Sequence, residues 1–282
     1  MLLAGWLLIA VAGTGPAVPA PAAVAISPGR TTTLIASDDV GAPLERAFPN
    51  PAYLRAAAAD AEGRWDDARI LYRQAADAWA AIDHTRPSRA LDLAVAKAEH
   101  EAMASQALAF RTRNPSGISG HLPEEARRTY RRRQAVEDAR LLRDKLMATR
   151  TARGQVAPLL YARTRARLED ARDNAEPGGS GDAEIALLMC ATEAVGGDLA
   201  AAGADRARAL PRQDAAEEDP DETVAAAACA AALGRSDAAL TALERFVLGS
   251  PLPRADATLR ELYLANDWDH LRGTPRFETL FR

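Results

Sequence analysis

The sequence predicts an all-α protein built from paired helices, with a longer helical region inserted between the first pair and the rest. Alanine dominates a chain that is 48% hydrophobic but only 5% aromatic, a composition that favours helices in close contact over a bulky core. Almost no segment shows the two-residue alternation of a strand. Gly63, Gly197 and Gly234 each separate two helix-like segments. Together these observations favour helical hairpins.

The first pair is predicted over residues 51–61 and 65–82, with Gly63 at the turn. A small residue, Ala61, ends the first helix, and an aromatic residue, Trp65, starts the second. Asp66 and Asp67 fall in the first turn of the second helix, where the helix dipole favours carboxylates. Small residues at fixed steps along both helices allow them to approach closely.

A longer helical region follows. From Pro87 to Phe110, apolar and small residues recur about every 3.5 residues, which is typical of a helical hairpin or a coiled-coil-like contact. These positions are Leu91, Val95, Ala98, Ala102, Ser105 and Ala109. A loop separates this segment from a long basic helix predicted over 124–152. Gly154 and Pro158 break that helix, and a further helix is predicted over 157–174.

The segment 177–181 is the clearest linker in the chain, because it is made of proline, glycine and serine. Two more pairs are predicted after it, one over 182–195 and 199–210 and one around Gly234. We therefore expect a first body over 50–176, holding the first pair and the long helices, and a second over 182–282. Residues 26–49 are predicted to be irregular.

Three segments share a pattern when they are aligned on their turn glycines. The first has Gly63, Trp65, Ala68, Tyr72 and Ala75. The second has Gly197, Leu199, Ala202 and Ala209, with Arg206 at an aromatic position of the pattern. The third has Gly234, Ala239, Leu243, Phe246 and Pro251, with Ser236 where an aromatic residue is usual. This pattern resembles the tetratricopeptide repeat, a helix-turn-helix unit of 34 residues. The resemblance covers less than half of the chain.

The resemblance implies a stack of helix pairs in which a protein partner lies against inward positions of the first helices. Transferred to this sequence, these positions are Tyr53, Ala57, Asp60, Glu184, Leu187, Ala191, Asp221, Val224 and Ala228. The set contains no Lys, Arg or Asn, so capture of a peptide carboxylate is not expected. A groove of small apolar residues suits a helix, and one of this chain's own long helices is a candidate.

The tail, residues 267–281, resembles the short closing helix that follows the last repeat in bacterial proteins of this kind. Asp267 is expected to cap a short turn that ends at Gly273. Thr274 and Pro275 then start another turn, whose Phe277 and Leu280 can cover the open end of the stack.

The N-terminus has the outline of a secretory signal peptide. An apolar run over 2–11 is followed by a Pro/Ala stretch, and Ala23-Val24-Ala25 provides a small-x-small cleavage site. The first charged side chain is Arg30. We therefore expect export to the periplasm or the exterior, with residues 1–25 either cleaved or kept as an anchor. A cytoplasmic protein remains the alternative if this segment is not a true leader.

Cys190 and Cys229 are the two cysteines of the chain, and both fall near the middle of a first helix in adjacent pairs. Such helices lie side by side in a stack. In an oxidising compartment the two residues can form a disulfide. The alternative is a pair of small, buried thiols in alanine-rich helices.

A basic run at the start of the long helix is the sharpest charge feature. It contains Arg127, Arg128, Arg131, Arg132 and Arg133. Residues 124–174 hold 14 Lys/Arg and 8 Asp/Glu, whereas residues 175–225 hold 3 and 12. Three interpretations stay open: a solvated helix face, a contact with the acidic half, or binding of an anionic lipid, polysaccharide or nucleic acid.

No catalytic, cofactor-binding or metal-binding pattern is found in the sequence. The histidines, His84, His100, His121 and His270, have no zinc-type spacing. The net charge of −4 argues against general nucleic-acid binding. We therefore expect a non-catalytic scaffold or adaptor in a bacterial envelope assembly that binds protein segments or helices. The alternative is a module whose helix 124–152 contacts the surface of a membrane or a polysaccharide.

Overall fold

The computed structural model describes residues 49–82, 88–114, 123–213, 219–249 and 257–281, all within one unit, Ser37–Arg282. These residues are helical and contain no strand, which confirms the all-α class for this part of the chain. The helices are α2 (Pro51–Ala61), α3 (Trp65–Ala80), α4 (Arg89–Arg113), α5 (Glu124–Arg153), α6 (Pro158–Asp173), α7 (Ser180–Gly196), α8 (Leu199–Gln213), α9 (Pro220–Ala232), α10 (Ser236–Gly249), α11 (Ala257–Leu264), η1 (Asn266–Trp268) and α12 (Pro275–Leu280). The expected leader, 1–25, lies outside the described residues.

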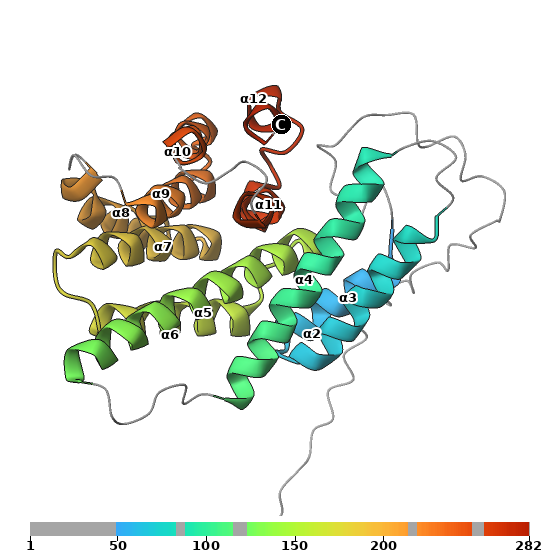
Figure 1. The fold of residues 1–282 in the computed structure, drawn as a ribbon, viewed down its shortest axis with the longest axis horizontal. Helices are drawn as coiled ribbons and strands as arrows, with labels where there is room; N and C mark the ends of the chain where they lie inside the picture. The colour runs from blue at the N-terminus through green and yellow to red at the C-terminus, as the bar shows by residue number, and fades with distance from the viewer. Residues whose placement is uncertain (1–48, 83–87, 115–122, 214–218, 250–256, 282) are drawn as a thin grey trace, which may run out of the picture. The chain divides into compact units, whose positions relative to one another are not determined.

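Three helical hairpins form where the sequence predicts them: α2 with α3, α7 with α8, and α9 with α10 (Figure 1). Each turn glycine has a positive φ, +71° at Gly63, +91° at Gly197 and +71° at Gly234. The amide that follows each glycine donates to a carbonyl five residues earlier, as in Asp198 N to Glu193 O at 2.9 Å. This is the Schellman ending, which needs a left-handed residue and therefore favours glycine.

The long helices occupy the predicted segments. The apolar and small positions predicted between Pro87 and Phe110 form the inward face of α4. Leu91, Ala98 and Ala102 on this face are buried, and α4 packs against α3. Helix α5 ends at Gly154, whose φ of +68° allows the chain to turn back. Helix α6 then packs along α5, and α5 also packs along α2 (Figure 1). The hairpin partner of α5 is therefore α6, while α4 extends the first pair.

The C-terminal tail differs from its prediction at Asp267. This residue does not cap a helix; its carboxylate accepts a hydrogen bond from Arg143 of α5, because the 3-10 turn η1 packs on that helix. The second expected turn forms as α12, where the Thr274 side chain accepts from the Phe277 amide. Phe277 is fully buried and packs against Tyr263 and Phe281.

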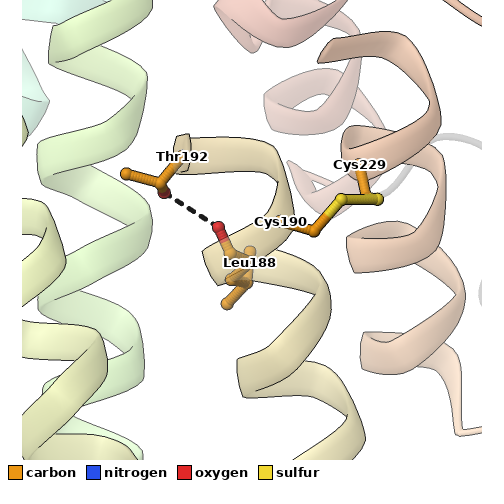
Figure 2. The surroundings of a disulfide bond; sticks show 4 residues. All are labelled: Leu188, Cys190, Thr192 and Cys229. Atoms are coloured by element: carbon orange, nitrogen blue, oxygen red, sulfur yellow. Dashed lines mark hydrogen bonds between the residues drawn. A yellow bond between two sulfur atoms is a disulfide. The ribbon is translucent and has the colours of Figure 1, made fainter. Parts of the chain in front are cut away.

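A disulfide joins the first helices of the last two hairpins, as Figure 2 shows. Cys190 of α7 and Cys229 of α9 are both buried, with an S–S distance of 2.04 Å. Of the two alternatives left open by the sequence, the structure therefore has the bonded one. The bond spans 39 residues of sequence. Among the described helices, none has both the length and the apolar character that a membrane span requires.

Removing this disulfide should destabilise the protein. In the chain-entropy model, a bond that closes a loop of 39 residues contributes about 4 kcal/mol by restricting the unfolded chain. The variant Cys190→Ala/Cys229→Ala should therefore lose about this much unfolding free energy in urea. Wild-type protein under reducing conditions is the matched control and should show a similar loss. Equal stability of the oxidised, reduced and double-alanine proteins would contradict the expectation.

Candidate functional site

The inward positions on α2 do not form an open surface, because α3 and α5 cover them. Tyr53 of α2 is buried against the rings of Tyr72 and Trp79. Asp60, seven residues and about two helical turns further, is fully buried and forms an ion pair with Lys145 of α5. The part of the predicted protein-binding set that lies on α2 is therefore covered by the chain itself. Asp60 does contact a helix, as expected for this set, but the helix is α5 of the same chain.

Helix α5 also reaches the predicted positions on α7 and α9. Arg140 contacts the Glu184 carboxylate at 2.6 Å and the Asp221 carboxylate at 3.0 Å. This contact joins basic α5 to the acidic half, one of the three interpretations of the charge pattern. Leu187 is buried and lines a groove of about 370 Å³ next to α8 and α10. Val224 is half-buried and lines a different cavity, described below.

The centre of this arrangement is a buried ion cluster around Lys145. Its Nζ lies 3.1 Å from Asp60 Oδ2, 2.6 Å from Glu101 Oε2 and 4.5 Å from the centre of the Tyr72 ring. Lys145, Asp60 and Glu101 are all fully buried. Ser105 donates to Asp60, and Asn266 donates to Glu101. One ammonium and two neutral donors thus serve two carboxylates contributed by α2 and α4.

Burial and charge act in opposite directions on this cluster. Burial is the largest effect on Lys145 and lowers its pKa, but the charges of Asp60 and Glu101 outweigh it and leave the pKa raised. Burial is also the largest effect on Asp60 and raises its pKa, which the nearby ammonium only partly offsets. Lys145 therefore keeps its charge in the folded protein.

The cluster extends to the C-terminal tail through Asp144. One carboxylate oxygen of this residue accepts from the Asn266 amide at 2.8 Å, and the other lies 3.2 Å from His100 Nε2. Burial is the largest effect on Asp144 and raises its pKa, but the His100 and Asn266 contacts outweigh it and hold the pKa far below its usual value. Together with the Arg143–Asp267 pair, these contacts attach η1 to α5.

Two adjoining hollows lie beside the contact between η1 and α5. The first, which we call the junction cavity, has a volume of about 280 Å³ and lies between α5, α9 and the segment from α11 to η1. The second, the α4–α11 groove, has a volume of about 580 Å³ and is lined by residues of α3, α4 and α11. His100 and Glu261 line both of them. Among the described residues, no group of acidic, histidine and cysteine side chains is arranged to hold a metal ion.

The arginine run is divided between chain contacts and solvent. Arg127 pairs with Glu124 at 2.8 Å, and the Arg132 guanidinium lies against Gly181 at the start of α7. Arg128 is exposed but lies 3.7 Å from Glu124, whereas Arg131 and Arg133 are exposed and make no ion pair with a described residue. Binding of an anionic surface through this run stays a prediction.

The two lysines are not among the site residues predicted from the sequence. In a chain whose cationic residues are otherwise arginine, Lys97 and Lys145 are the only lysines, and both are buried. Lys97 pairs with Asp269 at 2.5 Å, and Lys145 pairs with Asp60 and Glu101. A lysine ammonium is a compact charge with three donors, whereas an arginine guanidinium presents its donors in a planar fork. The rarity of lysine was thus a usable signal for the buried cluster.

Comparison of the chain with protein-family models, curated proteins and solved structures finds no match in any of the three. The function is therefore inferred from the geometry alone.

Replacing Lys145 by methionine should be strongly destabilising. It leaves two carboxylates buried without their cation, a change that costs about 3–5 kcal/mol in unfolding free energy. Arg131→Met on the exposed part of the same helix is the control and should change the unfolding free energy by no more than about 0.5 kcal/mol. Denaturant titration measures both. The double variant Asp60→Asn/Lys145→Met should lose less unfolding free energy than the sum of the losses of the two single variants. A loss equal to that sum would refute the ion cluster.

His100 should make stability depend on pH. Burial, the largest effect, lowers the His100 pKa, but Asp144 and Glu101 outweigh it and leave the pKa raised, while the nearby Lys145 acts against them. A raised pKa means that protonated His100 stabilises the fold at low pH and that this contribution is lost as pH rises. The difference in unfolding free energy between wild type and His100→Gln should therefore shrink between about pH 6 and 8.

Urea titrations of both proteins across this pH range measure that difference. His270, whose burial lowers its pKa, has the opposite effect but is present in both proteins and cancels. A difference that stays constant or grows with pH would contradict the expectation.

Proposed function

We propose that this chain is an exported, non-catalytic scaffold of the tetratricopeptide-like type, and that it binds a protein partner across the face formed by α3 and α4. The three glycine-turned hairpins support the repeat-like part of this proposal. The buried disulfide supports export, because such bonds persist in oxidising compartments. The site of binding is inferred from the exposed side chains of α3 and α4.

The observation that carries the proposal is an exposed apolar row on this face. Ile70 of α3 is 46% exposed, and Met103 and Phe110 of α4 are 58% and 63% exposed. Met103 and Phe110 are seven residues apart and so share one side of α4. Arg73 contacts Gln106, and Arg113 contacts Asp66, so the two helices run side by side with Ile70 near Phe110.

This row continues into the α4–α11 groove, because Met103 lines the groove as well. Large apolar side chains gathered beside a hollow are typical of protein-binding surfaces. Flexible methionine adapts to the shape of a partner. The rest of the groove lining carries both signs of charge, from Arg73 and Arg260 and from Asp77, Glu99 and Glu261. Such a mixed rim suits a helix that is apolar on one side and charged on its flanks.

Phe110→Glu should weaken partner binding about tenfold or more without unfolding the protein. A photoreactive amino acid at exposed Gln106, introduced into the chain in its native host, should crosslink to a discrete partner in the envelope fraction. Burying a phenylalanine side chain contributes about 2 kcal/mol, so its replacement by a charge should reduce the crosslink by about tenfold or more.

Leu248→Glu is the matched control, because Leu248 of α10 is 69% exposed and lies on a different helix pair. It should leave the crosslink unchanged, and thermal melts should show that both variants remain folded. The proposal fails if the two substitutions have the same effect on the crosslink, or if Gln106 captures no discrete partner.

A further inference from the structure

The junction cavity has a predominantly apolar lining. Its apolar residues come from five different helices and the η1 turn, so the cavity exists only when these elements are assembled. They are Leu141, Leu188, Val224, Ala225, Ala228, Phe246, Leu262, Ala265 and Trp268. At about 280 Å³, the cavity is large enough for one small organic molecule, such as a single ring with a short side arm.

The charged groups of this lining are unbalanced. Four carboxylates, those of Asp144, Asp221, Glu261 and Asp267, face two guanidinium groups, those of Arg140 and Arg143. Both arginines are already engaged: Arg143 pairs with Asp267, and Arg140 pairs with Asp221 and also with Glu184 outside the cavity. His100 pairs with Asp144. Within the part of the chain that the structure describes, the Glu261 carboxylate makes no ion pair.

Three further polar atoms of the lining residues are also unsatisfied. Arg143 Nε, Asp267 Oδ1 and Trp268 Nε1 are buried and make no hydrogen bond, although Asp267 Oδ2 is bonded to Arg143 through its Nη1. Unpartnered buried polar atoms are uncommon in folded proteins, and they are often explained by a missing water or ligand. Here they belong to residues that line one cavity; Asp267 Oδ1 is a hydrogen-bond acceptor, and Arg143 Nε and Trp268 Nε1 are donors.

We propose that the junction cavity binds a small molecule with an apolar body and a single ammonium group. The apolar lining contacts the body, and the ammonium is placed beside Glu261, whose exposed carboxylate provides the acceptor. An anionic molecule is disfavoured, because the lining has an excess of negative charge and no unengaged guanidinium. A neutral molecule of the same shape gains the apolar contacts but leaves the Glu261 charge unpaired.

This site adjoins the α4–α11 groove and shares His100 and Glu261 with it, but it does not include the exposed apolar row of the proposed protein-binding face. The α3–α4 row of Ile70, Met103 and Phe110 does not line the junction cavity. Binding of a small molecule to the purified chain can therefore succeed or fail whatever the outcome of the crosslinking experiment.

Three probes that share a phenylethyl body test the proposal on the purified, oxidised protein by isothermal titration calorimetry: phenethylamine, 2-phenylethanol and the slightly larger 3-phenylpropionate. Phenethylamine should bind at least about tenfold more tightly than the alcohol, which is the usual effect of making a hydrogen bond charge-assisted. Phenylpropionate should show no binding. Equal binding of the three probes, or no binding of the amine, would overturn the proposal.

Two variants locate the binding. Val224→Phe places a larger side chain in the cavity from a half-buried position and should remove amine binding. Glu261→Gln, at an exposed position, should weaken the amine about three- to fivefold and leave the alcohol unchanged. Glu125→Gln, exposed at the start of α5, is the control and should have no effect. Amine binding that survives Val224→Phe unchanged would place it elsewhere and refute the assignment.

Discussion

One ammonium group fixes how the helices of this protein meet. Lys145 is fully buried on α5, with Asp60 of α2 and Glu101 of α4 beside it. Taking these charges out of water costs several kcal/mol per ion unless partners surround them. The arrangement is therefore acceptable only when α2, α4 and α5 come together, and Asn266 brings the C-terminal tail to the same point through Glu101 and Asp144.

The helices themselves could be predicted from the sequence, because their signals are local. Gly63, Gly197 and Gly234 end their helices in the left-handed conformation that glycine favours, and Gly154 ends α5 in the same way. The predicted boundaries agree with the structure to within a few residues. The position of α5 across α2, α7 and α9 could not be predicted, since it depends on contacts between side chains 40 or more residues apart, such as Arg140 with Glu184 and Asp221.

Only part of the candidate sites could be predicted from the sequence, for the same reason. The repeat pattern indicates which positions of the first helices point inward, but not whether the chain covers them itself. Asp60 shows the difference: its place on α2 suits a partner contact, yet its charge meets Lys145 of the same chain. The cysteine pair could be placed side by side from the hairpin pattern, whereas its bonding could not. The exposed row on α3 and α4 lies outside the buried face of α4 that the sequence predicts, so no sequence pattern indicated it.

The same composition explains both the ion cluster and the cavity beside it. Alanine-rich helices pack closely, but rows of identical small side chains offer several registers of nearly equal contact area. Moving α5 by one turn, about 5.4 Å, would separate Lys145 from Asp60 and Glu101 and leave three charges buried alone. The ion cluster thus selects one register among those that the alanines permit. Once α5 is held there, Ala225, Ala228 and Ala265 are too short to fill the space between the helices, and the junction cavity remains.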